Sequence, residues 1–204
     1  MKAGGSVKKI GVLALQGDFA EHMATLRRLD ALAFPVRLPR ELEGVNGLII
    51  PGGESTTMAK LMTDFGLMAP LRKLCKQGLA VMGTCAGMVL LAKNITDTSD
   101  ANITPLGVMD IDVKRNAFGR QLDSFETDLE VAAIGEPAFH SVFIRAPFIQ
   151  RIGNGVTVLA RLPDDTCVAA RQGNMIALAF HPELTDDARL HSYFLTLVNG
   201  GGKK

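Results

Sequence analysis

Short apolar runs alternate with helix-like segments through the first half of the chain. Residues 9–15 and 47–50 are almost continuously apolar, which is the pattern of a strand buried on both faces of a parallel sheet. Apolar residues recur at helical spacing between these runs and after them, with one break near Gly66 and Pro70. The strands expected in this half are 9–15, 34–38, 47–50 and 79–82, and the helices are 19–32 and 57–76.

The second half has a different pattern. Apolar and polar residues alternate within 107–131, which favours antiparallel strands over another strand-helix unit, so we expect a small antiparallel β excursion over one side of the functional site. Further strands are expected at 140–147, 156–162, 166–171 and 175–180, and a closing amphipathic helix at 186–197. The order of elements predicts an α/β fold of the flavodoxin-like kind, an open, mostly parallel sheet flanked by helices, and the length fits one domain over 1–204.

Composition and charge mainly exclude functions. The net charge is +1 at pH 7, which gives no basic surface for nucleic acid, and no apolar run approaches the length of a membrane span or a secretory leader. Cys75, Cys85 and Cys167 are widely spaced without a C-x-x-C pair, so neither a disulfide framework nor a zinc site is indicated. We therefore expect a cytoplasmic protein with no nucleic-acid or membrane partner.

The clearest chemical signal is Cys85 in the stretch VMGTCAGMVL. It lies between Gly83 and Gly87, after a β-prone run and before a helix-like run, which is the pattern of a nucleophile elbow. Such a strained turn needs small neighbours, and unpaired N–H groups at the helix start favour a thiolate. An isolated cysteine is more often a buried structural residue. The two flanking glycines at a strand-to-helix junction favour the nucleophile.

A second informative turn, PGGESTT, follows the apolar run at 47–50. The glycine pair that ends at Gly53 lets the backbone turn its N–H groups outward, where they can hold an oxyanion, while Glu54 and Ser55 can cap the next helix. An ordinary loop explains the glycine pair equally well. Its place one strand-helix unit before Cys85 favours a functional role, because ligands gather beyond the carboxyl ends of neighbouring strands in open α/β sheets.

The last expected strand ends at His181-Pro182-Glu183. Residues two apart in an extended segment point the same way, so Glu183 can hold the His181 imidazole in one tautomer while its other nitrogen faces a nucleophile. A triad of Cys85, His181 and Glu183 follows. His181 and His191 are ten residues apart with no H-E-x-x-H arrangement, so we predict no metal site. The histidines interpreted as structural are His22, His140 and His191.

Arg115 and Arg120 lie in the segment RNAFGRQ, between the expected antiparallel strands. A solvated charged face is the usual explanation of such arginines, and an anion-binding role stays open.

The motifs together resemble a known family, the triad-type class I glutamine amidotransferases, and within it the glutaminase subunits of pyridoxal 5′-phosphate synthase. The segments that carry the resemblance are LALQG at 13–17, PGGESTT at 51–57, GTCAG at 83–87, RNAFGRQ and DSFE within 115–126, FIRAP at 143–147 and AFHPELT at 179–185.

The resemblance implies that Cys85 attacks the carboxamide of L-glutamine, that His181 passes a proton to the departing ammonia and that Glu183 orients His181. A γ-glutamyl thioester would form and then react with water. Backbone N–H groups near Gly53 and at Ala86 would stabilise the oxyanion, with Gln16 sensing the partner nearby. No cofactor is implied. The residues implied to bind glutamine are Gly53, Glu54, Ser55, Arg115, Ile144 and Arg145.

The resemblance also implies a partner, a (β/α)₈-barrel synthase subunit that receives the ammonia, builds pyridoxal 5′-phosphate and switches on the glutaminase within a hetero-oligomeric complex. Three alternatives stay open: a glutaminase that serves another synthase, a cysteine hydrolase or chaperone-like protein of the same fold, and a non-catalytic adaptor. RNAFGRQ and FIRAP disfavour the first, the HPE segment disfavours the second, and the apparently intact triad disfavours the third.

Overall fold

A ten-stranded sheet runs through the computed structural model, which describes residues 7–96, 103–115 and 124–198. Its strand order is β2-β1-β3-β4-β12-β11-β9-β6-β5, with β10 beside β11. The strands are β1 (Lys9–Leu13), β2 (Leu32–Val36), β3 (Gly47–Ile50), β4 (Ala80–Thr84), β5 (Ala92–Ile95), β6 (Met109–Lys114), β7 (Ser124–Leu129), β8 (Phe139–Ile144), β9 (Phe148–Ile152), β10 (Val156–Arg161), β11 (Cys167–Gln172) and β12 (Met175–Leu178). The run from β2 to β12 in this order is parallel, which confirms the predicted α/β fold with its mostly parallel sheet.

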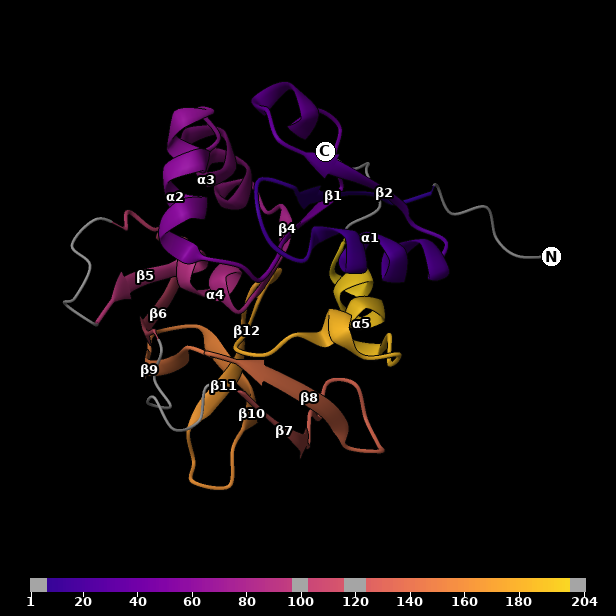
Figure 1. Ribbon diagram of the computed structural model, residues 1–204, viewed down its shortest axis with the longest axis vertical. Helices are drawn as coiled ribbons and strands as arrows, with labels where there is room; N and C mark the ends of the chain where they lie inside the picture. The colour runs from indigo at the N-terminus through magenta and orange to yellow at the C-terminus, as the bar shows by residue number, and fades with distance from the viewer. Residues whose placement is uncertain (1–6, 97–102, 116–123, 199–204) are drawn as a thin grey trace.

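Helices flank the parallel strands, with α2 and α3 on one side and α1 and α5 on the other (Figure 1). The helices are α1 (Phe19–Arg28), α2 (Ser55–Asp64), α3 (Met68–Lys76), α4 (Ala86–Leu91) and α5 (Arg189–Leu197), with short 3₁₀ helices η1 (Pro39–Leu42) and η2 (Pro182–Leu184). Among the described residues no helix has the length and apolarity that crossing a bilayer requires.

The parallel strands carry apolar side chains on both faces of the sheet, because helices cover both faces. Every residue of β3 and β4 is buried, and so is β1 from Ile10 onward. All six residues of α4 are buried as well. Such complete burial is typical of the centre of an α/β sheet, where burial of apolar area is the main stabilising term. The core therefore lies directly behind the carboxyl ends of these strands.

The first half of the chain follows the sequence prediction closely. β3 coincides with the expected strand, while the expected helix 19–32 ends at Arg28, because Asp30 adopts a positive φ of 57° that a helix cannot continue. β2 consequently starts at Leu32 instead of residue 34, in register with Lys9 of β1. The expected long helix is divided into α2 and α3 before Met68, and Pro70 lies in the first turn of α3, where its missing N–H costs no hydrogen bond.

The second half departs from the prediction in its strand partners. β6 and β7 were expected within one antiparallel excursion, but β6 joins the large sheet, antiparallel to β9 and parallel to β5. The small antiparallel sheet is formed by β7 and β8. β5 and β9 were not predicted. Alternating polarity identifies a strand but not its partner, and the partners here are far apart in sequence. The segment 116–123 lies outside the described residues.

Aromatic side chains fix the small sheet to the end of β12. The ring centroid of Phe143 in β8 lies 4.4 Å from that of Phe125 in β7 and 5.5 Å from that of Phe180, which follows β12. The next residue, His181, donates its backbone N–H to the carbonyl oxygen of Val142 at 2.9 Å. The position of His181 thus depends on β8 as well as on β12.

Two glycines allow the turn between β4 and α4 to pack closely against its neighbours. A Cβ atom on Gly87 would lie 2.0 Å from the carbonyl oxygen of Ile50 in β3, and one on Gly83 would lie 2.6 Å from the carbonyl group of Gly87. Both distances are far below van der Waals contact and involve backbone atoms that cannot rotate away. The crowding expected from the G-x-C-x-G spacing is therefore present in the fold.

We predict that Gly87→Ala lowers the free energy of unfolding by at least about 2 kcal/mol, because the new methyl group forces β3 and α4 apart. Gly44→Ala is the matched control. Gly44 has a φ of +72° with no heavy atom within 4 Å of its Cβ position. This variant therefore measures only the free-energy cost of placing alanine in the left-handed backbone region, about 1 kcal/mol. Urea unfolding of both variants measures the difference. An equal loss in the two variants would contradict the packing argument.

Candidate functional site

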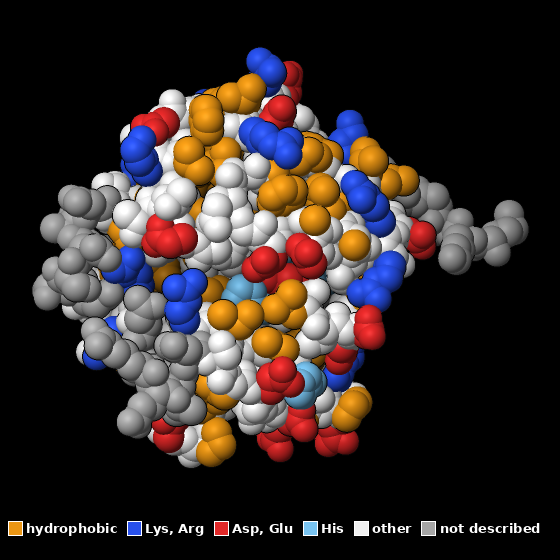
Figure 2. Space-filling view, in the orientation of Figure 1, with side chains coloured by type: hydrophobic (Ala, Val, Ile, Leu, Met, Phe, Trp, Pro, Cys, Tyr) orange, Lys and Arg blue, Asp and Glu red, His pale blue; other side chains and the backbone are white. Residues whose placement is uncertain are grey.

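The loops that follow β1, β3, β4 and β12 meet at one edge of the sheet, because the carboxyl ends of parallel strands lie together. They surround a cavity of about 340 Å³. On the face shown in Figure 2 a histidine lies near the centre, with acidic side chains on one side and basic ones on the other. The residues that line the cavity are Gln16, Asp18, Gly53, Glu54, Ser55, Cys85, Ala86, Val89, Arg115, Ile144, Arg145, Pro147 and His181.

Cys85 occupies the turn between β4 and α4 in a strained conformation. Its φ of 49° and ψ of −105° are unusual for a residue with a side chain. Backbone strain of this kind is more frequent at functional sites than elsewhere. Its N–H donates to the carbonyl oxygen of Leu178 at 2.8 Å, and its Sγ lies 3.8 Å from the carbonyl oxygen of Ile144. Ala86, the next residue, begins α4, so its N–H has no acceptor within the helix.

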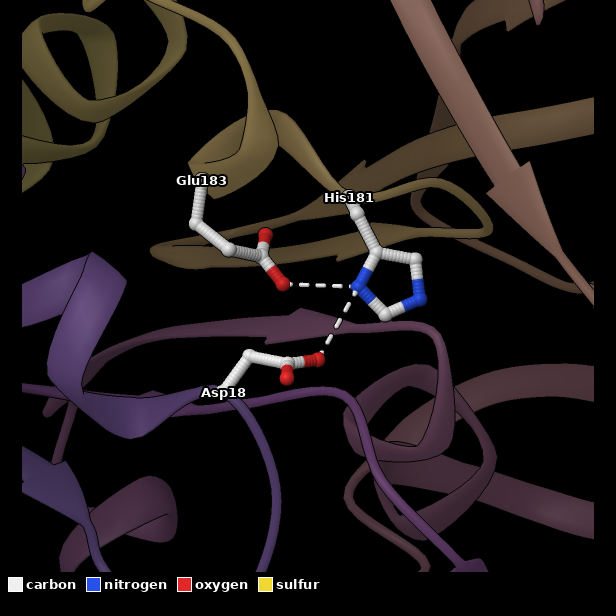
Figure 3. Close-up of side chains that lie close together, drawn as sticks. All are labelled: Asp18, His181 and Glu183. Carbon is white, nitrogen blue, oxygen red and sulfur yellow. Dashed lines mark hydrogen bonds and ion pairs between the residues drawn. The ribbon is translucent and has the colours of Figure 1, made fainter.

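His181 lies between two carboxylates, as Figure 3 shows. Its Nδ1 is 2.7 Å from Oε1 of Glu183 and 3.5 Å from Oδ2 of Asp18, while Nε2 lies on the opposite side of the ring. Glu183 does not lie in the extended segment that was predicted. Pro182–Leu184 form η2, because the proline fixes φ at a helical value, and this turn brings Glu183 back to the imidazole.

The charges around His181 favour its protonated form. Burial alone would lower its pKa, but the Cys85 thiol and the Glu183 carboxylate raise the pKa of His181 to about 10. Burial raises the pKa of Glu183, and the hydrogen bond from His181 opposes that shift. Nε2 of His181 is buried and has no hydrogen-bond partner among the described side chains. The Cys85 side chain is the group whose interaction favours a proton on His181 from the cavity side.

The loop of Gln16 packs against the glycine turn after β3. Oε1 of Gln16 accepts the backbone N–H of Glu54 at 2.7 Å, and a Cβ atom on Gly53 would lie 2.4 Å from the same oxygen. Glu54 caps α2 by accepting the N–H groups of Thr56 at 3.0 Å and Thr57 at 2.7 Å. Although burial raises its pKa, these bonds lower the pKa of Glu54 to about 2. The predicted capping role of Glu54 is therefore present.

Arg115 is only 8% exposed, so the explanation of this arginine as part of a solvated face is wrong. Its Nη1 donates to Oγ of Ser55 at 3.4 Å and to Oγ1 of Thr56 at 3.3 Å, which ties β6 to the start of α2. Arg115 lines the cavity together with Ile144, the last residue of β8, and Arg145, which follows it. Arg120 lies outside the described residues.

The model of the SNO glutamine amidotransferase family matches residues 12–199 of this chain. The chain belongs to this family. Two curated relatives, both named pyridoxal 5′-phosphate synthase subunit PdxT, come from Carboxydothermus hydrogenoformans and Corynebacterium jeikeium. Each is 54% identical, over 95% of this chain and 99% or 98% of its own length. A crystal structure of a glutamine amidotransferase is also 54% identical, with a TM-score of 0.86 over 93% of this chain and 98% of that one. The resemblance found in the sequence is confirmed.

Within this SNO family member, Asp18, His181 and Glu183 form the one group of described residues with the spacing of a metal site, their ligand atoms lying within 4.8 Å of one another. Nδ1 of His181 and Oε1 of Glu183 lie at hydrogen-bond distance, 2.7 Å, and each would have to turn from the other to bind an ion. The arrangement is better suited to a hydrogen bond between His181 and Glu183 than to binding a metal ion. The absence of a metal stays a prediction.

Asp18 is a member of this site that was not predicted from the sequence. Its side chain lines the cavity and lies 3.5 Å from Nδ1 of His181. The signal was its position, since Asp18 follows the first parallel strand at the edge where Gly53 and Cys85 follow theirs. Glu183 does not line the cavity, because it lies behind His181.

We predict that Cys85 reacts with iodoacetamide at neutral pH before the other two cysteines. All three thiols are free and buried, but Cys85 lines the cavity beside His181, whereas burial raises the pKa of Cys75 to about 11 and also raises the pKa of Cys167. Peptide mass mapping of briefly labelled native protein measures the order. Labelling of Cys75 or Cys167 ahead of Cys85 would contradict the prediction, and unfolded protein labelled at all three is the control.

Proposed function

We propose that this chain hydrolyses L-glutamine to L-glutamate and ammonia with Cys85, His181 and Glu183 as its catalytic triad. The observation that carries the proposal is that Cys85 and His181 line one cavity, with Glu183 held 2.7 Å behind the imidazole. Membership in a glutamine amidotransferase family supports glutamine as the amide that is cleaved. The strained turn at Cys85 supports its role as the nucleophile.

In the acylation step the Cys85 thiolate attacks the carboxamide carbon of glutamine. A C–S bond forms as the carbonyl electron pair moves to oxygen, and the proton on Nε2 of His181 passes to the amide nitrogen. The C–N bond then breaks, and ammonia leaves a γ-glutamyl thioester. The raised pKa of His181 supports this step, because the proton that the leaving group needs is already present at neutral pH.

In the second step water attacks the thioester carbonyl. Neutral His181 takes a proton from this water at Nε2, and the C–S bond breaks to release glutamate and regenerate the thiolate beside the imidazolium. Glu183 stays hydrogen-bonded to Nδ1 throughout and holds the ring in one orientation. We assign the oxyanion to the backbone N–H groups at Gly53 and Ala86, which both line the cavity.

We assign glutamine binding to Gly53 and to five side chains around the same cavity. The α-carboxylate of glutamine needs a cation, which Arg115 and Arg145 supply, and its ammonium group needs acceptors. Glu54 is one such acceptor, although both of its oxygens also cap α2. The remaining contacts are assigned to Ser55 and Ile144. Gln16, bonded to the Glu54 N–H, is assigned to sensing the partner.

We further propose that the ammonia passes to a (β/α)₈-barrel subunit of pyridoxal 5′-phosphate synthase within a hetero-oligomeric complex. The support is that relatives 54% identical to this chain are named as a subunit of that synthase. A partner that receives ammonia directly avoids wasting glutamine, which gives a reason for coupling the two activities. One buried apolar cluster extends through the part of the chain that the structure describes, which supports the assignment of residues 1–204 to one glutaminase domain.

We predict that Cys85→Ala and His181→Asn each lower kcat for glutamine hydrolysis by about 10⁴-fold or more. Glu183→Gln keeps measurable activity, roughly 10²-fold to 10⁴-fold below the parent, because it orients the ring without exchanging protons with substrate. Glutamate release measures all three, and thermal unfolding checks that the fold is kept. Cys167→Ala is the control and keeps full activity. Retained activity in Cys85→Ala would remove the nucleophile from the proposal.

We predict that glutamate production by the purified chain rises at least about tenfold when the barrel subunit from the same organism is added. The comparison is made at saturating glutamine, with bovine serum albumin as the control protein. Full activity without any response would indicate a glutaminase that acts alone or with another synthase. Hydrolysis of simple esters or amides without glutamine turnover would favour another class of cysteine hydrolase.

A further inference from the structure

A pair of buried histidines lies directly behind the Glu183 carboxylate. His22 in α1 and His191 in α5 are both 0% exposed, and Nδ1 of His22 is 2.9 Å from Nε2 of His191. On its other side, Nε2 of His22 lies 3.3 Å from Oε2 of Glu183 and 3.2 Å from Oγ1 of Thr84. Both histidines were expected to be structural, yet His22 contacts Glu183 of the proposed triad and Thr84, the residue before Cys85.

Burial favours the neutral form of both histidines. Burial, together with His191 and His181 nearby, lowers the pKa of His22 well below its usual value. Burial, assisted by Arg28, lowers the pKa of His191 to about 4. Each ring therefore carries one proton, and the hydrogen bond between the rings requires one nitrogen to donate and the other to accept.

The contacts favour one arrangement of the two protons. If Nε2 of His22 carries its proton, that N–H faces Oε2 of Glu183 and Oγ1 of Thr84, and Nδ1 accepts the N–H on Nε2 of His191. The opposite arrangement turns a lone pair of His22 toward Oε2. That oxygen is buried and has no hydrogen bond within the described part of the chain, so the opposite arrangement would leave it facing a second acceptor.

We propose that His22 is a positioning residue of the triad: its Nε2–H holds the second carboxylate oxygen of Glu183, and His191 fixes the tautomer of His22. This inference rests on the proposed function. Glu183 is then held at both oxygens, by His181 at Oε1 and by His22 at Oε2. Nε2 of His22 also lies within hydrogen-bond distance of the Thr84 hydroxyl. His22 in α1 therefore connects the Glu183 carboxylate to the end of β4, directly before Cys85.

The charged and titratable groups around this arrangement come from several elements of the described chain. His181 and Asp18 act on the pKa of Glu183, His191 and His181 act on that of His22, and Arg28 acts on that of His191. Nε2 of His22 lies 3.3 Å from Oε2 of Glu183. Removing the donor at His22 should raise the pKa of Glu183. Burial raises this pKa, hydrogen-bond donors lower it, and one donor would be lost. The carboxylate would then become protonated at a higher pH, and the acidic limb of the activity profile would move upward.

The first test is a ¹⁵N-histidine NMR spectrum of the resting full chain, assigned with His22→Gln and His191→Gln. The expected result is that both residues are neutral with the proton on Nε2 from mildly acidic to mildly basic pH. A proton on Nδ1 of His22 would overturn the proposal. This test does not depend on glutamine turnover, so it separates a failure of this inference from a failure of the proposed function.

The second test compares His22→Leu with His22→Gln in glutamate production. Leucine removes the donor, and we expect kcat to fall about 10-fold to 100-fold, with KM nearly unchanged and the acidic limb at higher pH. Glutamine places an amide N–H near the position of Nε2 and should restore most of kcat. His140→Leu and His140→Gln, at an exposed histidine in β8, are the matched controls and should leave both parameters unchanged.

Equal kcat values and pH profiles for His22→Leu and His22→Gln would overturn the proposal. If His22→Leu fails to fold, His191→Leu provides the same comparison, because it leaves His22 in place but removes the donor that fixes its tautomer. We then expect a smaller fall in kcat, of about threefold to tenfold, again with KM unchanged. An unchanged kcat in a folded His191→Leu variant would contradict the assigned role of His191.

Discussion

The site depends on how closely the Cys85 turn packs against the neighbouring strands. α4 begins immediately after β4, and Gly87 sits so near β3 that a methyl group would overlap the Ile50 carbonyl oxygen. This closeness holds Cys85 at a positive φ, at the edge where the other parallel strands also end. Without it the thiol would lie elsewhere, and the loops after β1, β3 and β12 would surround a cavity that lacks the Cys85 side chain.

Around that turn, the structure places charged groups where burial would normally disfavour them. His181 and Glu183 are 3% and 6% exposed, and a buried ion pair is tolerated only when its hydrogen-bonding positions are satisfied. His181 bonds Oε1 of Glu183, and the proposed role of His22, whose Nε2 lies 3.3 Å from Oε2, is to meet this requirement at the second oxygen. The small β7-β8 sheet packs against the segment that carries the pair, through the rings of Phe143 and Phe180 and the backbone bond from His181 to Val142. Burial of the pair strengthens the electrostatic interactions within it.

Local patterns in the sequence predicted the parts of the structure that depend on neighbouring residues. The Cys85 turn, the glycine turn before α2 and the parallel strands around them are visible as apolar runs and glycine spacing. Strand partners were less predictable, because β9 and β5 acquire their places through contacts with residues far away in the chain. Burial of Arg115 and the pairing of His22 with His191 also escaped prediction, since nothing local distinguishes a buried polar residue from an exposed one. The fold and proposed triad were accessible from sequence, whereas the supporting contacts were not.

The central claim is that Cys85 forms a covalent bond with glutamine in the cavity beside His181. The most direct measurement is mass spectrometry of the chain quenched in acid during steady turnover of glutamine, with the synthase subunit present. We predict that a fraction of the chain is heavier by one γ-glutamyl group, located on the peptide that contains Cys85 and absent without glutamine. Turnover without this adduct in rapidly quenched samples, or an adduct on another residue, would show that Cys85 does not form the bond.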